Sequence, residues 1–147
     1  MLITNHVLAG ALIGLAARRR PLTVAAAGAA SHFALDSIPH WGPDHDERLF
    51  NRVAVVDGLV GLATIGWVAR VVPRSRRLAV LAGIAGSCIP DLDKPALMFY
   101  GKSPFPAALD RFHAAIQRES AKRMRQEFGV TAVLSAAVLV ISAIARR

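Results

Sequence analysis

The feature that most constrains the fold of this chain is a series of apolar, helix-length segments separated by clusters of arginine. The segments cover about residues 5–17, 21–38, 49–72, 78–89 and 128–145, and none shows the polar–apolar alternation of a strand. Arginine clusters follow the first, third and last of them, at 18–20, 74–77 and 146–147. This pattern predicts an all-α protein, an up-and-down bundle of about five helices that forms a single domain over residues 1–147.

The composition indicates that the bundle is associated with a membrane. Hydrophobic residues make up 54% of the chain and charged residues 19%, a more apolar balance than is usual for a soluble domain. Because the arginine clusters fall at alternate helix ends, we expect them on one side of the bundle, the cytoplasmic side. The expected protein is a multi-pass protein of the cell (inner) membrane whose polar site faces outside the cytoplasm. The first and fourth segments are shorter than the about 20 residues of a full span, so a partly embedded bundle and a soluble, alanine-rich bundle remain alternatives.

The two ends of the chain differ in character. The N-terminal run, MLITNHVLAG, lacks the basic start of a signal peptide, so we expect it to be retained. Residues 107–127 combine several Lys and Arg residues with apolar ones at helical spacing, which predicts an amphipathic helix along the lipid headgroups, before a C-terminal apolar helix over 128–145. The net charge of +8 also suits a basic, nucleic-acid-associated helical protein, although few aromatic residues lie among the arginines.

Residues 31–47, SHFALDSIPHWGPDHDE, carry the most distinctive polar pattern. His32 and Asp36 are four residues apart and therefore share one face of a helix, with Cβ atoms about 5–6 Å apart. Pro39 ends this helix, and His40 follows in the turn beyond it. Two imidazoles and a carboxylate in this arrangement form half of a shell for Zn²⁺ or a similar cation. The alternative is a helix end whose polar residues face water.

Further ionisable residues are expected at the same end of the bundle. His6 begins the first helix, with Gly10 and Gly14 following it in a small-residue stripe suited to close helix contact. Asp57 lies within an apolar helix, where a carboxylate is costly unless it is paired, with a nearby arginine as the alternative partner to a cation. Carboxylates and imidazoles gathered on one face repel one another without a metal. The remaining members of this group are Asp91 and Asp93 in a PDLD turn and His113 in the basic segment.

Four stretches in order, TNHVLAGALIG, SHFALDSIPHW, VVDGLVG and AGIAGSCIPDLDKP, resemble the small, predicted membrane-bound metal-dependent hydrolases. More distantly, they resemble the zinc-dependent phospholipase C and nuclease P1 superfamily. The resemblance covers most of the chain up to about residue 117. After the PDLD turn many relatives carry a histidine-arginine-glycine stretch followed by threonine-histidine-serine, and this chain has RFHAAIQ in that region.

This resemblance implies a helical metal site and the hydrolysis of a phosphoester. In that case Asp36 bridges cations, and His40 or His113 protonates the leaving group. A site at the membrane surface favours a lipid phosphoester as the substrate. The expected partners are therefore this phosphoester and membrane lipid. The implied ligands of the divalent metal, expected to be Zn²⁺, are His6, His32, Asp36, Asp57, Asp91 and Asp93. The alternative is a non-catalytic integral membrane protein in which the same residues hold a structural metal or an ion-pair cluster.

Overall fold

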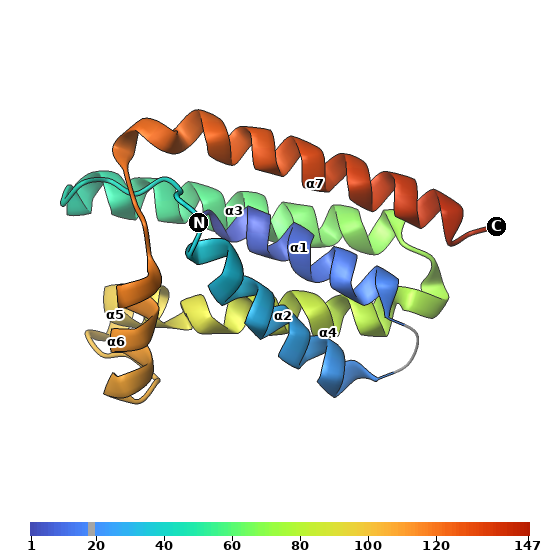
Figure 1. Ribbon diagram of the computed structural model, residues 1–147, viewed down its shortest axis with the longest axis horizontal. Helices are drawn as coiled ribbons and strands as arrows, with labels where there is room; N and C mark the ends of the chain where they lie inside the picture. Colours follow the sequence, from blue (N-terminus) through green and yellow to red (C-terminus); the bar gives the residue numbers. More distant parts are fainter. Residues whose placement is uncertain (18–19) are drawn as a thin grey trace.

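Helices account for most of the computed structural model, which describes residues 1–17 and 20–147 (Figure 1). The α-helices are α1 Ile3–Ala16, α2 Pro21–Asp36, α3 Glu47–Val71, α4 Arg77–Cys88, α5 Asp93–Tyr100, α6 Ala107–Ile116 and α7 Met124–Ile144. The 3₁₀ turns are η1 Arg74–Arg76, η2 Ile89–Leu92 and η3 Ala121–Arg123. No β-strand is found in the described ranges, so the expected all-α class is confirmed.

The helix ends follow ordinary local rules. Pro21 stands in the first turn of α2, where its missing N–H group costs nothing. The side chain of Asp46 accepts a hydrogen bond of 3.0 Å from the backbone N–H of Leu49 and so caps α3. Gly101 ends α5 with φ of 69°, a left-handed conformation that glycine adopts without strain.

The five longer α-helices, α1 to α4 and α7, run alongside one another in alternating directions, whereas α5 and α6 form a separate lobe at one end (Figure 1). Helix α1 is central, because it packs against α2, α3, α4 and α7. The buried core joins α1 to its neighbours through the residues Val7, Leu8, Ala11, Leu15, Val68, Val72, Val80, Ile84 and Val138. The up-and-down arrangement therefore agrees with the prediction, and the α5–α6 lobe is an addition to it.

Helix α4 approaches both α1 and α2 at backbone distance. A Cβ atom placed on Gly83 would lie 2.2 Å from the carbonyl oxygen of Gly10, and one on Gly86 would lie 2.0 Å from the carbonyl oxygen of Ala25. Only glycine can occupy such positions, since any side chain would overlap the neighbouring backbone. The expected role of Gly10 and Gly14 in close packing is therefore confirmed.

Two segments differ from the sequence-based expectation. Residues 107–127 do not form one amphipathic helix, because α6 ends at Ile116 and residues 117–120 are extended. Here His40 exchanges backbone hydrogen bonds of 3.0 Å with Arg118 and Ser120, and this pairing interrupts the helix. Residues 93–100, which lie outside the segments predicted to be helical, form α5, whose first turn accommodates Pro95.

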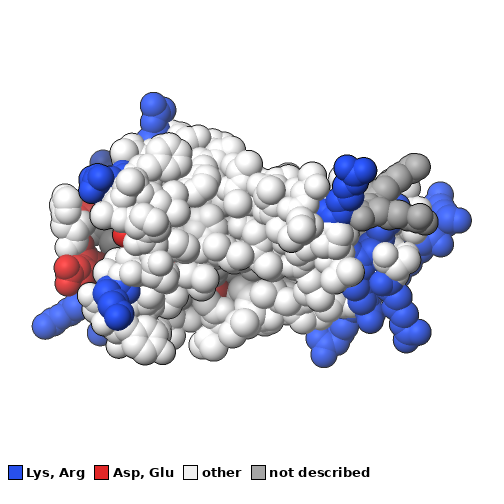
Figure 2. Space-filling view, turned by 90° about the horizontal axis from the view of Figure 1, so that it is seen from below, with Lys and Arg blue, Asp and Glu red and all other residues white. Residues whose placement is uncertain are grey.

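Charge is unevenly distributed along the bundle. Arg76 donates a hydrogen bond of 2.7 Å to the carbonyl of Ala17, and Arg146 donates one to the carbonyl of Val71, so the arginine clusters lie together. Figure 2 shows this arginine end, a largely uncharged middle, and mixed charges at the opposite end. Residues 18 and 19 of the first cluster lie outside the described residues. The remaining members of the arginine end are Arg20, Arg74, Arg77 and Arg147.

Two helices are long and apolar enough to cross a membrane: Glu47–Val71, which is α3, and Ala121–Ile144, which contains α7. Only 17% of the apolar window of each is buried inside the protein. Large apolar side chains on both helices face outward, such as Leu62, 67% exposed, and Val133, 69% exposed. We call this outward-facing apolar surface of α3 and α7 the apolar belt.

Candidate metal centre

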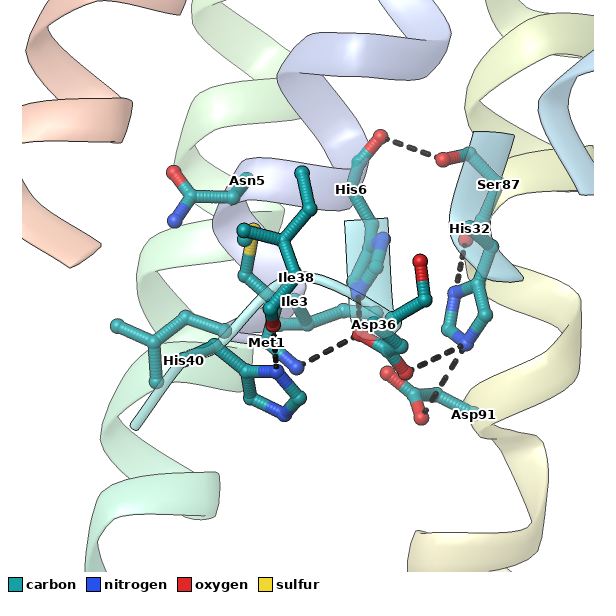
Figure 3. Close-up of polar contacts among 12 residues, drawn as sticks. Met1, Ile3, Asn5, His6, His32, Asp36, Ile38, His40, Ser87 and Asp91 are labelled. Carbon is teal, nitrogen blue, oxygen red and sulfur yellow. Dashed lines mark hydrogen bonds and ion pairs between the residues drawn. The ribbon is translucent and has the colours of Figure 1, made fainter. Parts of the chain in front are cut away.

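The last turn of α2 carries the pair that its spacing predicted. His32 and Asp36 lie one turn apart and are both fully buried. The Nε2 atom of His32 is 3.2 Å from Oδ2 of Asp36, so the two side chains converge on one point. Helix α2 ends at Asp36 at the end of the bundle where the α5–α6 lobe lies (Figure 1), and its two side chains point toward Asp91 (Figure 3).

Asp91 from η2 and His113 from α6 complete a group of four, here called the His–Asp cluster: His32, Asp36, Asp91 and His113. The Nε2 atom of His113 lies 3.0 Å from Oδ2 of Asp36 and 3.0 Å from Nε2 of His32. Oδ1 of Asp91 lies 3.8 Å from each of the two imidazole Nε2 atoms. One ligand atom from each residue falls within 4.8 Å of all the others. Ligands held about 2.0–2.2 Å from a Zn²⁺ ion are separated by roughly 3–4 Å, so the donor atoms fit a divalent cation.

The tautomer of His32 follows from its neighbours. Its Nδ1 atom lies 2.9 Å from the backbone carbonyl of Ser87, and a carbonyl oxygen only accepts, so Nδ1 carries the proton. In the neutral imidazole Nε2 then presents a lone pair toward the cluster. A hydrogen bond from Nδ1 to a backbone carbonyl is the usual way in which a protein orients a metal-binding histidine.

His113 is placed between two carboxylates. Its Nε2 atom faces Asp36, and its Nδ1 atom is 3.7 Å from Oδ2 of Asp93. Burial alone would lower the pKa of His113, but hydrogen bonding to Asp36 and Asp93 raises that pKa to about 9. Without a metal, a proton on His113 therefore holds the carboxylates together, and a divalent cation would replace it.

His6 lies on the other oxygen of Asp36. Its Nε2 atom is 3.1 Å from Oδ1, and its ring stacks on that of His32 with centroids 4.0 Å apart. The backbone amine of Met1 also lies 2.7 Å from this oxygen, and the hydroxyl of Ser87 donates to the carbonyl of His6 at 2.8 Å (Figure 3). His6 is thus in contact with the cluster but outside the group of four, and it orients Asp36.

Asp93 is also a neighbour of the cluster rather than a member. It accepts a hydrogen bond of 2.7 Å from the backbone N–H of Lys94, whose Nζ lies 3.4 Å from the same carboxylate and 3.7 Å from Asp91. Burial opposes ionisation of Asp93, but His113 and Lys94 lower the pKa of its carboxyl below the usual value. Asp93 is therefore an anionic support for His113.

Asp57 is not brought to the His–Asp cluster. Its carboxylate accepts hydrogen bonds from the backbone N–H groups of Ile3 and Thr4 and, at 2.6 Å, from the hydroxyl of Thr4. These N–H groups belong to the first turn of α1, where the helix itself offers them no partner. Asp57 therefore caps α1 from the neighbouring helix, which explains a carboxylate inside an apolar segment.

His40 lies outside the group of four as well. Its Nδ1 atom is 2.8 Å from the carbonyl of Ile38, while its buried Nε2 atom makes no hydrogen bond with any described residue and is 3.8 Å from Oε1 of Glu119. Its suggested role as a proton donor stays a prediction.

Three polar residues that make contacts in this part of the structure were not singled out in the sequence. Ser87 and Lys94 orient the cluster, and nothing in their local sequence distinguishes them. Glu127 is 1% exposed and accepts hydrogen bonds from Leu2, from Asn5 and from the backbone of Trp41. An isolated carboxylate at the start of a long apolar run is the signal that would have identified Glu127.

A cavity of about 610 Å³ lies beside the cluster. Asp91 and Lys94 form part of its wall, and most of the other lining residues are apolar, with the largest share from α3. We call it the side cavity. Its volume falls within the range of about 300–1,000 Å³ that is usual for ligand pockets. No protein-family model, curated protein or solved structure matches the chain, so the functional argument depends on this geometry.

Proposed function

We propose that this chain is a membrane-bound, metal-dependent hydrolase of phosphoesters whose divalent cation is held by the His–Asp cluster. The observation that carries the proposal is the convergence of His32, Asp36 and His113, with donor atoms 3.0–3.2 Å apart in a buried space. Two imidazoles and two carboxylates form a mixed nitrogen and oxygen donor set, which suits Zn²⁺. The resemblance of four ordered stretches to predicted membrane-bound metal-dependent hydrolases supports the same reaction class.

A divalent cation in the cluster would supply Lewis acidity, which lowers the pKa of water and polarises a phosphoryl oxygen. The residues of the chain orient the cluster for this task. The Ser87 carbonyl keeps the lone pair of His32 directed inward, and His6 holds one oxygen of Asp36 so that the other faces the cluster. Lys94 places a positive charge beside Asp91 at the cavity wall, where it attracts an anionic phosphoryl group. In hydrolysis the oxygen of water bonds to phosphorus, the bond to the ester oxygen breaks, and a proton passes to the departing alcohol.

The metal content of the purified protein tests this proposal. Protein prepared without a His tag and without added metal should contain about one divalent cation per chain by elemental analysis. Asp36→Asn keeps the size of the side chain and removes its charge, so it should lower the metal content and any hydrolysis of a phosphoester panel.

Asp44→Asn is the matched control. Asp44 is exposed, its carboxylate accepts a hydrogen bond of 3.3 Å from Ala121, and its backbone has φ of 45°. Asparagine retains an acceptor oxygen and tolerates that conformation, so metal content should be unchanged. Full metal content in Asp36→Asn, or a wild-type protein that never binds metal, would end the proposal.

A second candidate is a non-catalytic membrane protein with a structural metal. The burial of the cluster favours it, because His32 and Asp36 are 0% exposed and His113 is 3% exposed. Structural zinc sites are closed in this way, whereas catalytic sites keep one position open. Stoichiometric metal with no turnover over the whole panel would select this candidate.

We also propose that α3 and α7 cross the membrane with the arginine end in the cytoplasm. The short connections at 17–20 and 72–76 carry arginine without any acidic residue, whereas the connection from α2 to α3 at the opposite end carries Asp44 and Asp46. Basic residues in short loops are typical of the cytoplasmic side.

A further inference from the structure

The side cavity suggests the class of substrate. We propose that it receives the hydrocarbon chain of a single-chain amphiphilic phosphoester whose phosphoryl group faces the His–Asp cluster. This inference rests on the proposed function and adds the substrate class to it: a lipid phosphoester rather than a soluble nucleotide.

The first support is the shared wall between the cavity and the cluster. Asp91 lines the side cavity and also places Oδ1 3.8 Å from the Nε2 atoms of His32 and His113. Lys94 lines the cavity next to it, with Nζ 3.7 Å from Asp91. A phosphoryl group at this end of the cavity would therefore lie next to both the Lys94 ammonium group and the His–Asp cluster. The rest of the ligand would extend into the cavity.

The second support is the chemistry of the remaining wall. Away from Asp91 and Lys94 the cavity is formed chiefly by apolar side chains, including Phe50 and Val53 from α3 and Met98 from α5, and its other polar lining residues are Asp57, Gln117 and Glu119. Such a surface gains about 25 cal/mol for each Å² of apolar area removed from water, and it offers few partners for a sugar or a base. A hydrocarbon chain is the ligand that matches it.

The third support is the position of the cavity relative to the apolar belt. Leu59 and Leu62 line the cavity and are 64% and 67% exposed on α3, and Phe99 lines it from α5 with 71% exposed. The rim is thus continuous with the outward-facing apolar surface of α3. A lipid chain can reach the cavity from that surface without passing through water.

Gly58 gives a way to block the cavity without disturbing the backbone. It lines the cavity on α3, and a Cβ atom added there meets nothing within 4 Å. Gly129 on α7 is exposed, lies away from the cavity, and also has nothing within 4 Å of an added Cβ atom. Gly58→Phe and Gly129→Phe are therefore matched variants, one that fills the cavity and one that does not.

Chain binding is measured through Trp41, which lines the cavity and is 8% exposed. The chain has 2 tryptophans, so Trp67→Phe leaves Trp41 as the only one. In detergent-solubilised protein, dibromohexadecyl phosphate should quench Trp41 fluorescence saturably, and unbrominated hexadecyl phosphate should compete. Gly58→Phe should weaken this binding by about tenfold or more, which is roughly 1.4 kcal/mol, whereas Gly129→Phe should not change it. Equal quenching in the two variants would show partition into the detergent and would overturn the inference.

Turnover is a separate readout. Gly58→Phe should slow the hydrolysis of hexadecyl p-nitrophenyl phosphate more than that of the methyl ester, methyl p-nitrophenyl phosphate. The ratio of the two hydrolysis rates should fall by about tenfold in Gly58→Phe and stay unchanged in Gly129→Phe. Saturable quenching without any hydrolysis would support chain binding and defeat the hydrolase proposal. Hydrolysis of the methyl ester without saturable quenching would defeat the chain-binding inference and leave the hydrolase proposal standing.

Discussion

The contact between α1 and α4 predicts that Gly83→Ala destabilises the bundle. A Cβ atom at residue 83 would lie 2.2 Å from the carbonyl oxygen of Gly10, which belongs to a helix backbone and cannot rotate away. The added methyl group therefore forces the two helices roughly 1 Å apart, and the tightly packed core between them must open with it.

The size of the effect follows from two opposing contributions. Overpacking of this kind lowers the free energy of unfolding by about 1–3 kcal/mol. The better helix propensity of alanine raises it by at most about 1 kcal/mol. At Gly129 an added Cβ atom meets nothing within 4 Å, so Gly129→Ala gains the propensity without the clash. Because both variants gain the propensity, they should differ by the overpacking cost alone, about 1–3 kcal/mol in the free energy of unfolding, or roughly 3–10 °C in Tm for a chain of this length.

The assay is thermal unfolding of the detergent-solubilised protein, followed by circular dichroism. Gly83→Ala should melt below the wild type and Gly129→Ala at or above it. Gly83→Ala should also weaken Zn²⁺ binding, because the displaced helix carries Ser87, whose carbonyl orients His32. Equal melting temperatures for the two variants would refute the argument that backbone contact at Gly83 sets the distance between the helices.

Three further predictions concern protonation, burial and orientation. Because the pKa of His113 is raised from 6.5 to about 9, the stabilisation that its proton provides to the metal-free protein is complete below pH 6.5 and lost as pH rises through about 9, as a melting series with a chelator would detect. As pH rises from 6.5 to about 9, the affinity for Zn²⁺ should rise by up to about tenfold per pH unit, because the metal replaces the His113 proton. A Zn²⁺ affinity that does not change with pH would contradict the raised pKa of His113. Glu127→Leu removes the carboxylate that accepts from the backbone N–H groups of Leu2 and Trp41 and from the side-chain amide of Asn5, so it should cost about 3 kcal/mol or more in denaturant unfolding, and Glu127→Gln should cost less. With Cys88 replaced by Ser, Asp44→Cys should react with a membrane-impermeant maleimide from outside the cell and Ser75→Cys should not, and the reverse pattern would invert the proposed orientation.

The bundle helices were predictable because their signals are local. Apolar runs of helical length, ended by Pro39 or by arginine clusters, marked α1 to α4 and α7 to within a few residues. Helix α5 was missed because Pro95 and the neighbouring aspartates resemble a turn, although proline is harmless in a first helical turn. The break at residues 117–120 was missed because its cause, pairing with His40, is tertiary.

The candidate site was predictable only in part, because only some of its contacts are local in the sequence. The spacing of His32 and Asp36 is local, and it placed them on one face. Their partners are Asp91 in η2 and His113 in α6, and the tertiary fold brings both to α2. Sequence periodicity does not predict such a tertiary contact. For Asp57 the apolar context showed that a partner was needed, but that partner is the backbone of α1, and backbone N–H groups leave no sequence signal.

The His–Asp cluster joins two bodies of the molecule. His32 and Asp36 belong to α2 and Asp91 to η2, at the end of α4, whereas His113 belongs to α6 in the lobe. A cation bound by these residues would hold the lobe against the bundle. A chain that has not yet bound its cation would have a loosely attached lobe, which would be exposed to the quality-control proteases of the cell. We therefore expect the cellular half-life of the protein to track the supply of its metal, shortening under chelation in pulse–chase experiments, and the Asp36→Asn variant to be short-lived whatever the supply.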